Sequence, residues 1–397
     1  MKHTNQVVNI TAIGTGQRLR DVIRRVLNAG KGRIKVAAVY DPDPLSVESF
    51  IEEFGNGATV YDHEEAAIAH AESEWVFIGS WNCHHARQIQ LAFSHGKNVF
   101  CEKPLATTME DCLAVRDAMN QSRRVFAFGL VLRYSNHYRK IRELLDNGAI
   151  GELVSFEFNE TLGIDHGAYI FGNWRREREH AGTHILEKCC HDLDLANWLT
   201  DSLPVKVASF GGKNVFVPEK RFLQEEAGER FDERSPYVKW KCKDARNVDP
   251  FSAGASIMDN QVVILEYANG TRATFHTNAH STQPERRFYL NGTKGAIRAD
   301  LLTGKAELTQ LDGENKTTVI TTLPPGDMHG GGDEIMAEHL AGCLLDGREP
   351  LASVTEGICS AFTAFAIDRA ADTNSVVELA PVWYAAGIDP HDEPDPS

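Results

Sequence analysis

The first 130 residues alternate short apolar runs with stretches in which apolar residues recur every three or four positions. The apolar runs predict strands, and the longer repeat predicts helices with one buried face. We expect strands over 7–13, 34–40, 58–61, 75–78, 98–100 and 125–128, and helices over 18–29, 45–54, 86–95 and 109–121. Parallel strands need long crossover connections, usually helices, so this alternation predicts a doubly wound parallel sheet of the α/β class.

Beyond about residue 130 the pattern becomes that of an α+β domain. Helices are expected over 137–147, 334–345 and 355–371, and strands over 153–159, 262–267 and 271–276. The last two strands flank Asn269-Gly270, a pair that readily takes the positive φ angles of a tight primed hairpin turn. This half is therefore predicted to hold a large open sheet of mixed or antiparallel strands.

Two segments depart from this pattern. Residues 211–256 are polar and weakly periodic, which predicts a long excursion rather than core, with a role in function or in oligomer contacts. Residues 387–397 form an acidic, proline-containing tail that we expect to be disordered. The predicted domains are accordingly 1–130 and 131–386, followed by this tail.

Composition narrows the function classes. The formal net charge is −15, so the overall field repels polyanions, and nucleic acid is not expected as a partner. No apolar stretch approaches the roughly 20 residues that cross a bilayer, and the first residues lack the apolar run of a secretion signal. The eight cysteines are scattered without Cys-x-x-Cys pairs, as expected of reduced thiols. We expect a cytoplasmic protein that does not bind membranes.

A dinucleotide site is predicted at the first strand-to-helix turn. Gly14-Thr15-Gly16 directly follows the first predicted strand and precedes a helix, where backbone N–H groups can bind a pyrophosphate. Leu19 stands where the fingerprint has its third glycine, and a simple tight turn is the alternative. Asp41 ends the second strand, where a carboxylate can accept both ribose hydroxyls and repel a 2′-phosphate. NAD is therefore favoured over NADP, although Asp41 could also be a turn residue.

Three further motifs carry a family resemblance. They are Gly96 to Leu105, which contains Glu102-Lys103-Pro104, then Ser80-Trp81-Asn82-Cys83-His84-His85, and finally Leu186 to Asp194. In their order along the chain, they resemble the signatures of the Gfo/Idh/MocA oxidoreductases, the glucose-fructose oxidoreductase and inositol dehydrogenase family. The departures are Leu19, Trp81 for Pro, Glu187 for Asp and Cys189 for Gly, and the last two indicate a subfamily with an altered substrate pocket.

The resemblance implies an N-terminal Rossmann domain, bound NAD and a C-terminal substrate domain that commonly pairs subunits into a homodimer or homotetramer. The residues that it implies for the cofactor are Gly14, Gly16, Gln17, Arg18, Asp41, Ser80, Asn82, His85 and Glu102. It also implies that Lys103 lies beside the nicotinamide and the substrate hydroxyl. By its residue type alone, Lys103 would instead be interpreted as a surface lysine in a turn.

One predicted helix face carries several ionisable groups. The residues His184, Glu187, His191, Asp194 and Trp198 follow the three-four spacing of a single stripe. A solvated face and a zinc or manganese site are the alternatives, but the spacing is not that of a His-Glu-x-x-His motif, and the resemblance implies no metal. We expect His191 to be the general base, Lys103 to stabilise the developing alkoxide or share the proton relay, and Glu187 to fix His191 or bind a neighbouring hydroxyl.

Substrate contacts are expected from four residues, Arg133, Trp174, Arg175 and Asp194. An aromatic ring beside an arginine can pack on a sugar face while the guanidinium donates to its hydroxyls, although a basic surface loop is the alternative. Arg133 resembles the family's domain junction, and Asp333 is expected to cap a late helix.

The predicted function is an NAD-dependent interconversion of a secondary alcohol and a ketone on a cyclic sugar, sugar derivative or inositol. Two alternatives stay open. An enzyme of the same family could retain NAD and cleave a glycosidic bond without net oxidation, or the chain could be a non-catalytic NAD-binding regulator. The presence of both Lys103 and His191 argues against the regulator.

Overall fold

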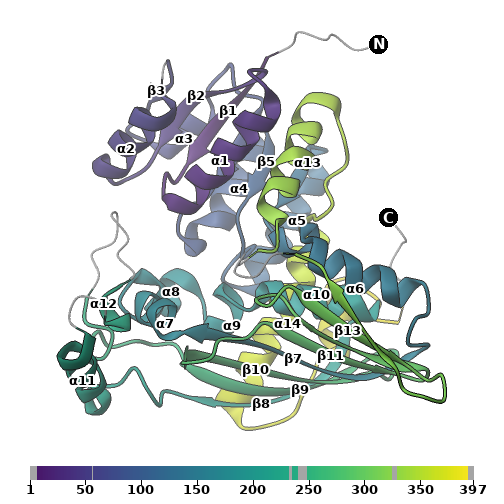
Figure 1. Ribbon diagram of the computed structural model, residues 1–397. Helices are drawn as coiled ribbons and strands as arrows, with labels where there is room; N and C mark the ends of the chain where they lie inside the picture. Colours follow the sequence, from purple (N-terminus) through teal and green to yellow (C-terminus); the bar gives the residue numbers. More distant parts are fainter. Residues whose placement is uncertain (1–6, 56, 232–234, 240–247, 324–328, 392–397) are drawn as a thin grey trace. The chain divides into compact units, whose positions relative to one another are not determined.

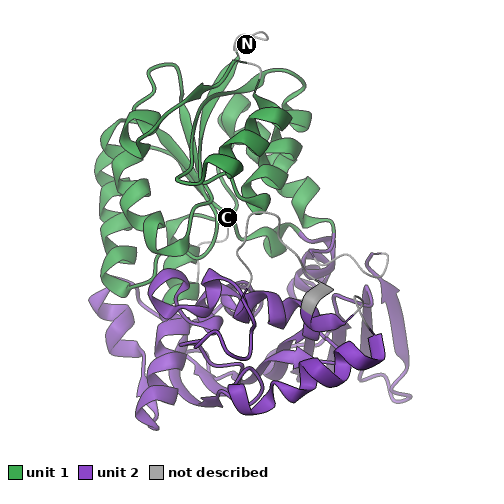
Figure 2. Ribbon diagram, turned by 90° about the vertical axis from the view of Figure 1, so that its left-hand side faces the viewer, with its two compact units in different colours: residues 1–134, 331–361 green, residues 135–330, 362–397 purple. Residues whose placement is uncertain are grey.

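The computed structural model describes residues 7–55, 57–231, 235–239, 248–323 and 329–391. The chain forms two compact units (Figure 2). Unit 1 consists of residues 1–134 and 331–361, and unit 2 consists of residues 135–330 and 362–397. The chain therefore returns to unit 1 late in the sequence. The domain boundaries at 130 and 386 stay predictions.

Unit 1 is built on a parallel sheet. In the described part of the chain its strands are β1 (Val8–Ile13), β2 (Ile34–Tyr40), β3 (Thr59–Val60), β4 (Trp75–Ile78), β5 (Asn98–Cys101) and β6 (Phe126–Phe128). Their order is β3-β2-β1-β4-β5-β6, and all pairs are parallel. The helices are α1 (Gln17–Gly30), α2 (Pro44–Phe54), α3 (Glu64–Ile68), α4 (His85–Ser94), α5 (Met109–Ser122) and α13 (Gly332–Asp346). The predicted doubly wound fold is confirmed.

The sequence pattern accounts for these elements directly. Every residue of β4 is buried, as expected of a strand covered on both faces. Helices α2 and α5 begin at N-cap side chains, because Asp43 accepts from the Leu45 N–H and Thr108 from the Asp111 N–H. Helix α1 turns Leu19, Val22 and other apolar residues inward, and it lies beside α13 (Figure 1).

Unit 2 holds the predicted large mixed sheet. Its strands, among the described residues, are β7 (Leu153–Gly163), β8 (Pro204–Gly212), β9 (Asn260–Tyr267), β10 (Arg272–Ser281), β11 (Arg287–Gly292), β12 (Gly295–Asp300), β13 (Lys305–Gln310), β14 (Thr317–Thr321) and β15 (Val377–Glu378). The order is β14-β13-β12-β11-β7-β10-β9-β8-β15, with β7 and β10 parallel and the other pairs antiparallel.

The helices of unit 2 include α6 (Asn136–Asp146), α7 (Ile164–Phe171), α8 (Arg178–Ala181), α9 (His184–Glu187), α10 (Cys190–Thr200), α11 (Phe222–Phe231), α12 (Pro236–Lys239) and α15 (Ala380–Ala385). Helix α14 (Val354–Thr373) begins in unit 1 and continues into unit 2. The helix expected from His184 onward is thus interrupted at Lys188 and Cys189.

The predicted hairpin at Asn269-Gly270 is confirmed, but its turn differs from the one expected. Strand β9 ends at Tyr267 and β10 begins at Arg272, and only Gly270 of the intervening residues has a positive φ, of 84°. Asn269 instead uses its side chain, because Oδ1 accepts from the Thr271 N–H and Nδ2 donates to the Thr200 carbonyl. A type I′ turn needs positive φ at both central positions, so the side-chain bonds select another turn.

The prediction that residues 211–256 contribute no core is wrong for the described part of that segment. Phe216, Tyr237 and Phe251 are buried in one apolar cluster with Phe171 of α7. The rings of Phe171 and Phe216 stack with centroids 4.5 Å apart. The signal was missed because single aromatic residues, widely spaced in polar sequence, produce no period of two or 3.6.

Candidate functional site

The predicted cofactor residues of unit 1 gather at one edge of its sheet. Gly14 follows β1, Asp41 follows β2, Ser80 follows β4 and Glu102 follows β5, and these four strands are consecutive in the sheet. The carboxyl ends of parallel strands meet at the same edge, which is where ligands bind in open α/β sheets. The structure therefore brings these residues to one edge.

Gly14 is required by a close approach of two loops. Its φ is +80°, and a Cβ there would lie 2.4 Å from the Ser80 backbone nitrogen. Leu19, which occupies the position of the fingerprint's third glycine, packs against Gly79, where a Cβ would lie 2.7 Å from the Leu19 Cβ. The glycine at 79 thus makes the room that Leu19 needs beside the sheet.

The start of α1 fits a bound pyrophosphate. A Cβ on Gly16 would meet nothing within 4 Å, and no side chain among the described residues caps the helix at Gly16. The first backbone N–H groups of a helix have no intrahelical acceptor, so an uncapped start with open space can bind an anion. Gln17, also predicted for the cofactor, donates from Nε2 to Asp21 Oδ1 at 3.1 Å.

Asp41 is partly engaged by its own turn. Its Oδ2 accepts from the Thr15 backbone N–H at 2.6 Å and from Thr15 Oγ1 at 3.1 Å, and Oδ1 accepts from the Asp43 N–H at 2.9 Å. Burial raises the pKa of Asp41 against the lowering effect of these hydrogen bonds. Because a carboxylate has about four acceptor positions, one ribose hydroxyl can bind Oδ1, while a second needs Thr15 Oγ1 to turn away.

The predicted residues after β4 lie inside unit 1. Asn82 begins the short 3₁₀ helix Asn82–His84 and is buried, and His85, which begins α4, is 1% exposed. His85 Nδ1 lies 2.7 Å from the Pro104 carbonyl oxygen, and Nε2 lies 3.1 Å from that of Ser80. Burial lowers the pKa of His85. His85 therefore joins the loop after β4 to the loop after β5, and Ser80 Oγ donates to Gln88 Oε1 at 2.6 Å.

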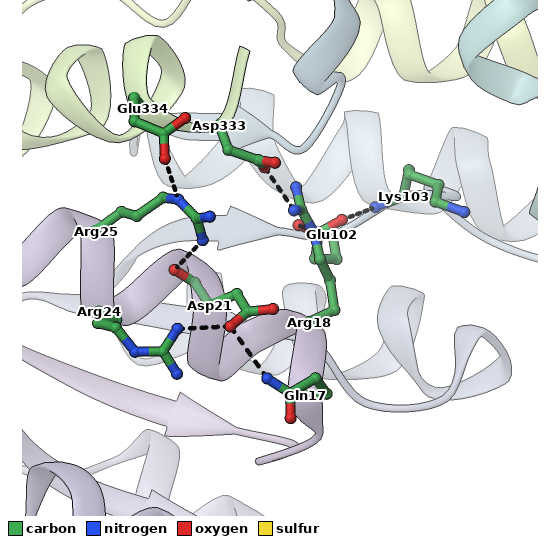
Figure 3. A network of polar contacts seen from close by, with 9 residues as sticks. All are labelled: Gln17, Arg18, Asp21, Arg24, Arg25, Glu102, Lys103, Asp333 and Glu334. Carbon is green, nitrogen blue, oxygen red and sulfur yellow. Dashed lines mark hydrogen bonds and ion pairs between the residues drawn. The ribbon is translucent and has the colours of Figure 1, made fainter. Parts of the chain in front are cut away.

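Arg18 and Glu102, both predicted for the cofactor, bind each other (Figure 3). Arg18 Nε donates to Glu102 Oε1 at 2.8 Å, and Nη1 donates to Asp333 Oδ1 at 2.6 Å. The prediction that Asp333 caps its helix is wrong, because Gly331 is the N-cap of α13 and Asp333 lies in the first turn. Lys103 is half-buried, and its backbone nitrogen lies 3.4 Å from Glu102 Oε2.

The ionisable stripe predicted after Thr183 is buried in unit 2. His184, Glu187, His191 and Asp194 are each at most 7% exposed, which excludes a solvated face. His184 Nε2 lies 3.1 Å from Thr277 Oγ1 of β10, and burial lowers the pKa of His184 to about 4. The break at Lys188 and Cys189 divides the stripe between α9 and α10.

Glu187 and the two predicted substrate residues beside it form a second group. Glu187 Oε1 accepts from Arg175 Nε at 3.1 Å, and Arg175 Nη1 donates to the Tyr169 hydroxyl at 2.8 Å. The Arg175 guanidinium carbon lies 4.5 Å from the centroid of the Trp174 ring. Trp174 and Arg175 are half-buried, so they form a fixed aromatic and cationic surface rather than a loose basic loop. Arg133 lies in unit 1, half-buried in the 3₁₀ helix Val131–Tyr134.

A buried ion network that the sequence pattern did not predict surrounds α10. Arg286 binds both oxygens of Asp192 at 2.8 and 2.7 Å and Glu160 Oε2 at 2.7 Å, while Lys188 Nζ lies 3.2 Å from Glu160 Oε1. Although burial opposes its charged form, the neighbouring Arg286 and Lys188 hold the pKa of Glu160 well below its usual range. The available signal in the sequence was the presence of two charged residues, Lys188 and Asp192, close to apolar residues on either side of His191.

The described residues contain neither a candidate metal-ligating group nor a candidate membrane-spanning helix. Among the described residues, no group of three or more His, Cys, Asp or Glu side chains is arranged to hold a metal ion. No helix in the described part of the chain is long and apolar enough to cross a bilayer.

Two family models match the chain. Residues 8–130 match the oxidoreductase family's NAD-binding Rossmann fold, and residues 142–379 match the same family's C-terminal alpha/beta domain. The chain belongs to the Gfo/Idh/MocA oxidoreductase family. The resemblance in the motifs is thereby confirmed, and unit 1 of this family member contains an NAD-binding Rossmann fold.

Three similar proteins each share between 18% and 32% of their aligned residues with this family member. YteT of Bacillus subtilis (strain 168) is 25% identical over 390 residues, which cover 86% of this chain and 90% of YteT. An inositol 2-dehydrogenase of Gluconacetobacter diazotrophicus is 32% identical over 198 residues, which cover 49% of this chain and 55% of that protein. A levoglucosan dehydrogenase solved with NADH and levoglucosan has a TM-score of 0.77 at 18% identity, covering 94% of this chain and 99% of its own.

Proposed function

We propose that this chain is an NAD-dependent dehydrogenase that interconverts a secondary alcohol and a ketone on a cyclic sugar, sugar derivative or inositol. Membership of the oxidoreductase family with an NAD-binding Rossmann fold supports the cofactor and the reaction class. The substrate class is supported by the names of two similar proteins, an inositol 2-dehydrogenase and a levoglucosan dehydrogenase.

The observation that carries the proposal is the position of Lys103. It follows the buried Glu102 directly after β5, at the sheet edge that also bears Gly14 and Asp41. An ammonium group at this edge can donate a hydrogen bond to an oxygen that becomes negative during hydride transfer. Nicotinamide, when bound, supplies the hydride acceptor.

The proton of the alcohol needs a base, because an alkoxide is too costly to form first at neutral pH. His191 is the proposed base, with Lys103 stabilising the same oxygen or sharing the proton relay. Histidine takes up and releases protons near neutral pH, which suits a reaction that runs in both directions. Glu187 is placed by its bond to Arg175, so its proposed role is to hold that guanidinium or to bind a substrate hydroxyl.

Trp174, Arg175 and Asp194 are the proposed substrate residues of unit 2. Arg175 is held by Glu187 and Tyr169 above the Trp174 ring, so the ring and the guanidinium keep a fixed relation before any ligand binds. A ring that packs on a sugar face and a guanidinium that donates to hydroxyls are the groups that recognise a polyol.

The test is the appearance of reduced nicotinamide absorbance with NAD, and then with NADP, across inositols, monosaccharides, anhydrosugars and glycosides. Lys103→Ala and His191→Ala should lose the signal, whereas the exposed-site controls Lys35→Ala and His63→Gln should keep it. No absorbance change together with cleaved glycosides would instead identify the redox-neutral enzyme. Tight NAD binding without any product would identify the regulator.

A further inference from the structure

We propose that Asp333, acting through Arg18, is a positioning residue for the Glu102-Lys103 segment. This inference rests on the function proposed above, in which Lys103 contacts the reacting oxygen. It assigns to Arg18 a role other than binding the cofactor phosphates. The three side chains come from the first turn of α13, the first turn of α1 and the residue after β5.

Arg18 binds two carboxylates of its own unit. Its Nε and Nη1 groups donate charge-assisted hydrogen bonds of 2.8 and 2.6 Å to the carboxylates of Glu102 and Asp333, respectively (Figure 3). Those carboxylates are 7% and 16% exposed, whereas the Arg18 side chain is 31% exposed. One positive charge thus faces two mostly buried negative charges. Binding a phosphate through Nε, or through the Nη1 hydrogen that Asp333 accepts, would require Arg18 to leave a carboxylate whose burial is tolerated only when it is paired.

Glu102 is confined on its other side as well. Its backbone N–H donates to the Ile78 carbonyl, and a Cβ on Gly129 would lie 3.0 Å from Glu102 Oε2. The same Oε2 lies 3.4 Å from the Lys103 backbone nitrogen. The carboxylate therefore stands between Arg18 and the base of the Lys103 side chain. Asp333 fixes the guanidinium, the guanidinium fixes Glu102, and Glu102 fixes the point from which the Lys103 amine extends.

The same two helices provide a matched control. Glu334, next to Asp333 on α13, accepts from Arg25 Nε of α1 at 2.8 Å. Its side chain is 62% exposed, and Arg25 donates its other bond to the Asp21 carbonyl rather than toward Glu102 (Figure 3). Glu334→Gln therefore removes one carboxylate between α1 and α13 without touching the path to Lys103.

The first experiment needs neither cofactor nor substrate. The full-length protein is treated with acetic anhydride, and the acetylation rate of Lys103 is measured by peptide mass spectrometry in the wild type, Asp333→Asn, Arg18→Gln and Glu334→Gln. Exposed Lys31 and Lys305 serve as internal references. We expect Lys103 to react about threefold faster or more in Asp333→Asn and Arg18→Gln, because a less restrained Glu102-Lys103 backbone lets the Lys103 amine sample more conformations. Glu334→Gln and the reference lysines should be unchanged.

Arg18→Gln separates positioning from simple electrostatics. Removing a positive charge raises the pKa of a nearby lysine and lowers its neutral, reactive fraction, so electrostatics alone predicts slower acetylation. Faster acetylation supports positioning. Slower or unchanged acetylation in Arg18→Gln, unchanged acetylation in Asp333→Asn, or a change shared with Lys31 and Lys305 would overturn it.

The second experiment uses NAD titration calorimetry and, with a substrate identified from the panel, steady-state turnover. In Asp333→Asn we expect NAD affinity within about twofold of wild type and kcat reduced about tenfold, as expected for a misplaced group. If Arg18 were a phosphate ligand restrained by Asp333, the variant would instead bind NAD several-fold more tightly, which would overturn the inference. Absence of turnover in the wild type would refute the proposed function and leave the acetylation result to decide the role of Asp333.

Discussion

Thr183 donates its hydroxyl hydrogen to Asp368 Oδ2, and the same Thr183 oxygen accepts the Leu186 N–H at the start of α9. Asp368 lies on α14 and is 5% exposed. It faces Gln261 of β9, Arg178 of α8 and Asp372 of its own helix. The N-cap of the short helix that carries His184 and Glu187 is therefore held by a buried carboxyl group far away in the sequence.

The pH dependence of stability should report on Asp368. Burial raises its pKa to about 7 from an ordinary value of 3.8. A group whose pKa is raised by folding stabilises the fold fully below its unfolded value and loses that contribution as pH rises through the folded value. The stability of wild type relative to Asp368→Asn should therefore fall between about pH 4 and 7, at up to about 1.4 kcal/mol per pH unit.

Urea unfolding of unit 2, followed at several pH values, measures this difference. Glu157→Gln is the control, because it changes a carboxylate at an exposed position of β7 that is not among the groups facing Asp368. It should keep the wild-type slope. A stability difference between wild type and Asp368→Asn that does not change with pH would contradict the prediction.

Removing one member of the buried ion network should destabilise the fold more than replacing an ion pair of the network with apolar residues. Arg286→Met removes the cation that binds both Asp192 and Glu160. Of the cations in this network, Lys188 is then left, paired with Glu160. We expect the free energy of unfolding to fall by about 3–5 kcal/mol in Arg286→Met, because an uncompensated buried carboxylate remains. The double variant Arg286→Met with Asp192→Leu should recover part of it, since both members of a buried pair are then removed. Thermal melts followed by circular dichroism compare the three proteins, and a double variant no more stable than the single one would disprove this explanation.

Gly14 and Gly16 should respond differently to alanine. At Gly14 the positive φ and the close Ser80 backbone predict that Gly14→Ala lowers both the melting temperature and NAD affinity. Gly16 has a φ of −63° and open space for a Cβ, so Gly16→Ala should keep the melting temperature and weaken NAD binding alone. Thermal melts and NAD titration calorimetry separate the two effects. Wild-type NAD affinity in Gly16→Ala would place the pyrophosphate elsewhere.

The predicted pairing of subunits has a candidate surface on the unit 2 sheet. Phe210, Val262 and Ile264 are 69%, 50% and 57% exposed on β8 and β9. Phe210 and Val262 are direct partners in the ladder and Ile264 lies two residues further on, so all three point from the same face. We expect Phe210→Glu with Ile264→Glu to lower the mass measured by sedimentation equilibrium, whereas Leu45→Glu, on an exposed position of unit 1, should leave it unchanged. An unaltered mass in the double variant would show that copies do not pair through this face.

The sequence predicted most of the local structure of unit 1, because strands buried on both faces and amphipathic helices carry strong periodic signals. The predicted strand over 75–78 and helix over 109–121 agree with β4 and α5 within one residue. The hairpin at Asn269-Gly270 was predicted from residue types that favour a turn, although the turn that forms is not the expected primed one. Phe216 and Phe251 were missed because isolated aromatic residues reveal their burial only when distant segments pack around them.

What the sequence determined by itself is therefore the family, the parallel fold of the first domain and the motifs that place Gly14, Asp41 and Lys103 at strand ends, because these depend on neighbouring residues. The tertiary structure alone decided that Arg18 binds Glu102 and Asp333, that Glu187 binds Arg175, and that Asp192 pairs with Arg286. Except for Glu187 and Arg175, these partners are 84 or more positions apart. The sequence shows where the carboxylates are, and a buried carboxylate needs a cationic partner. Only the packing of distant elements determines which cation that partner is.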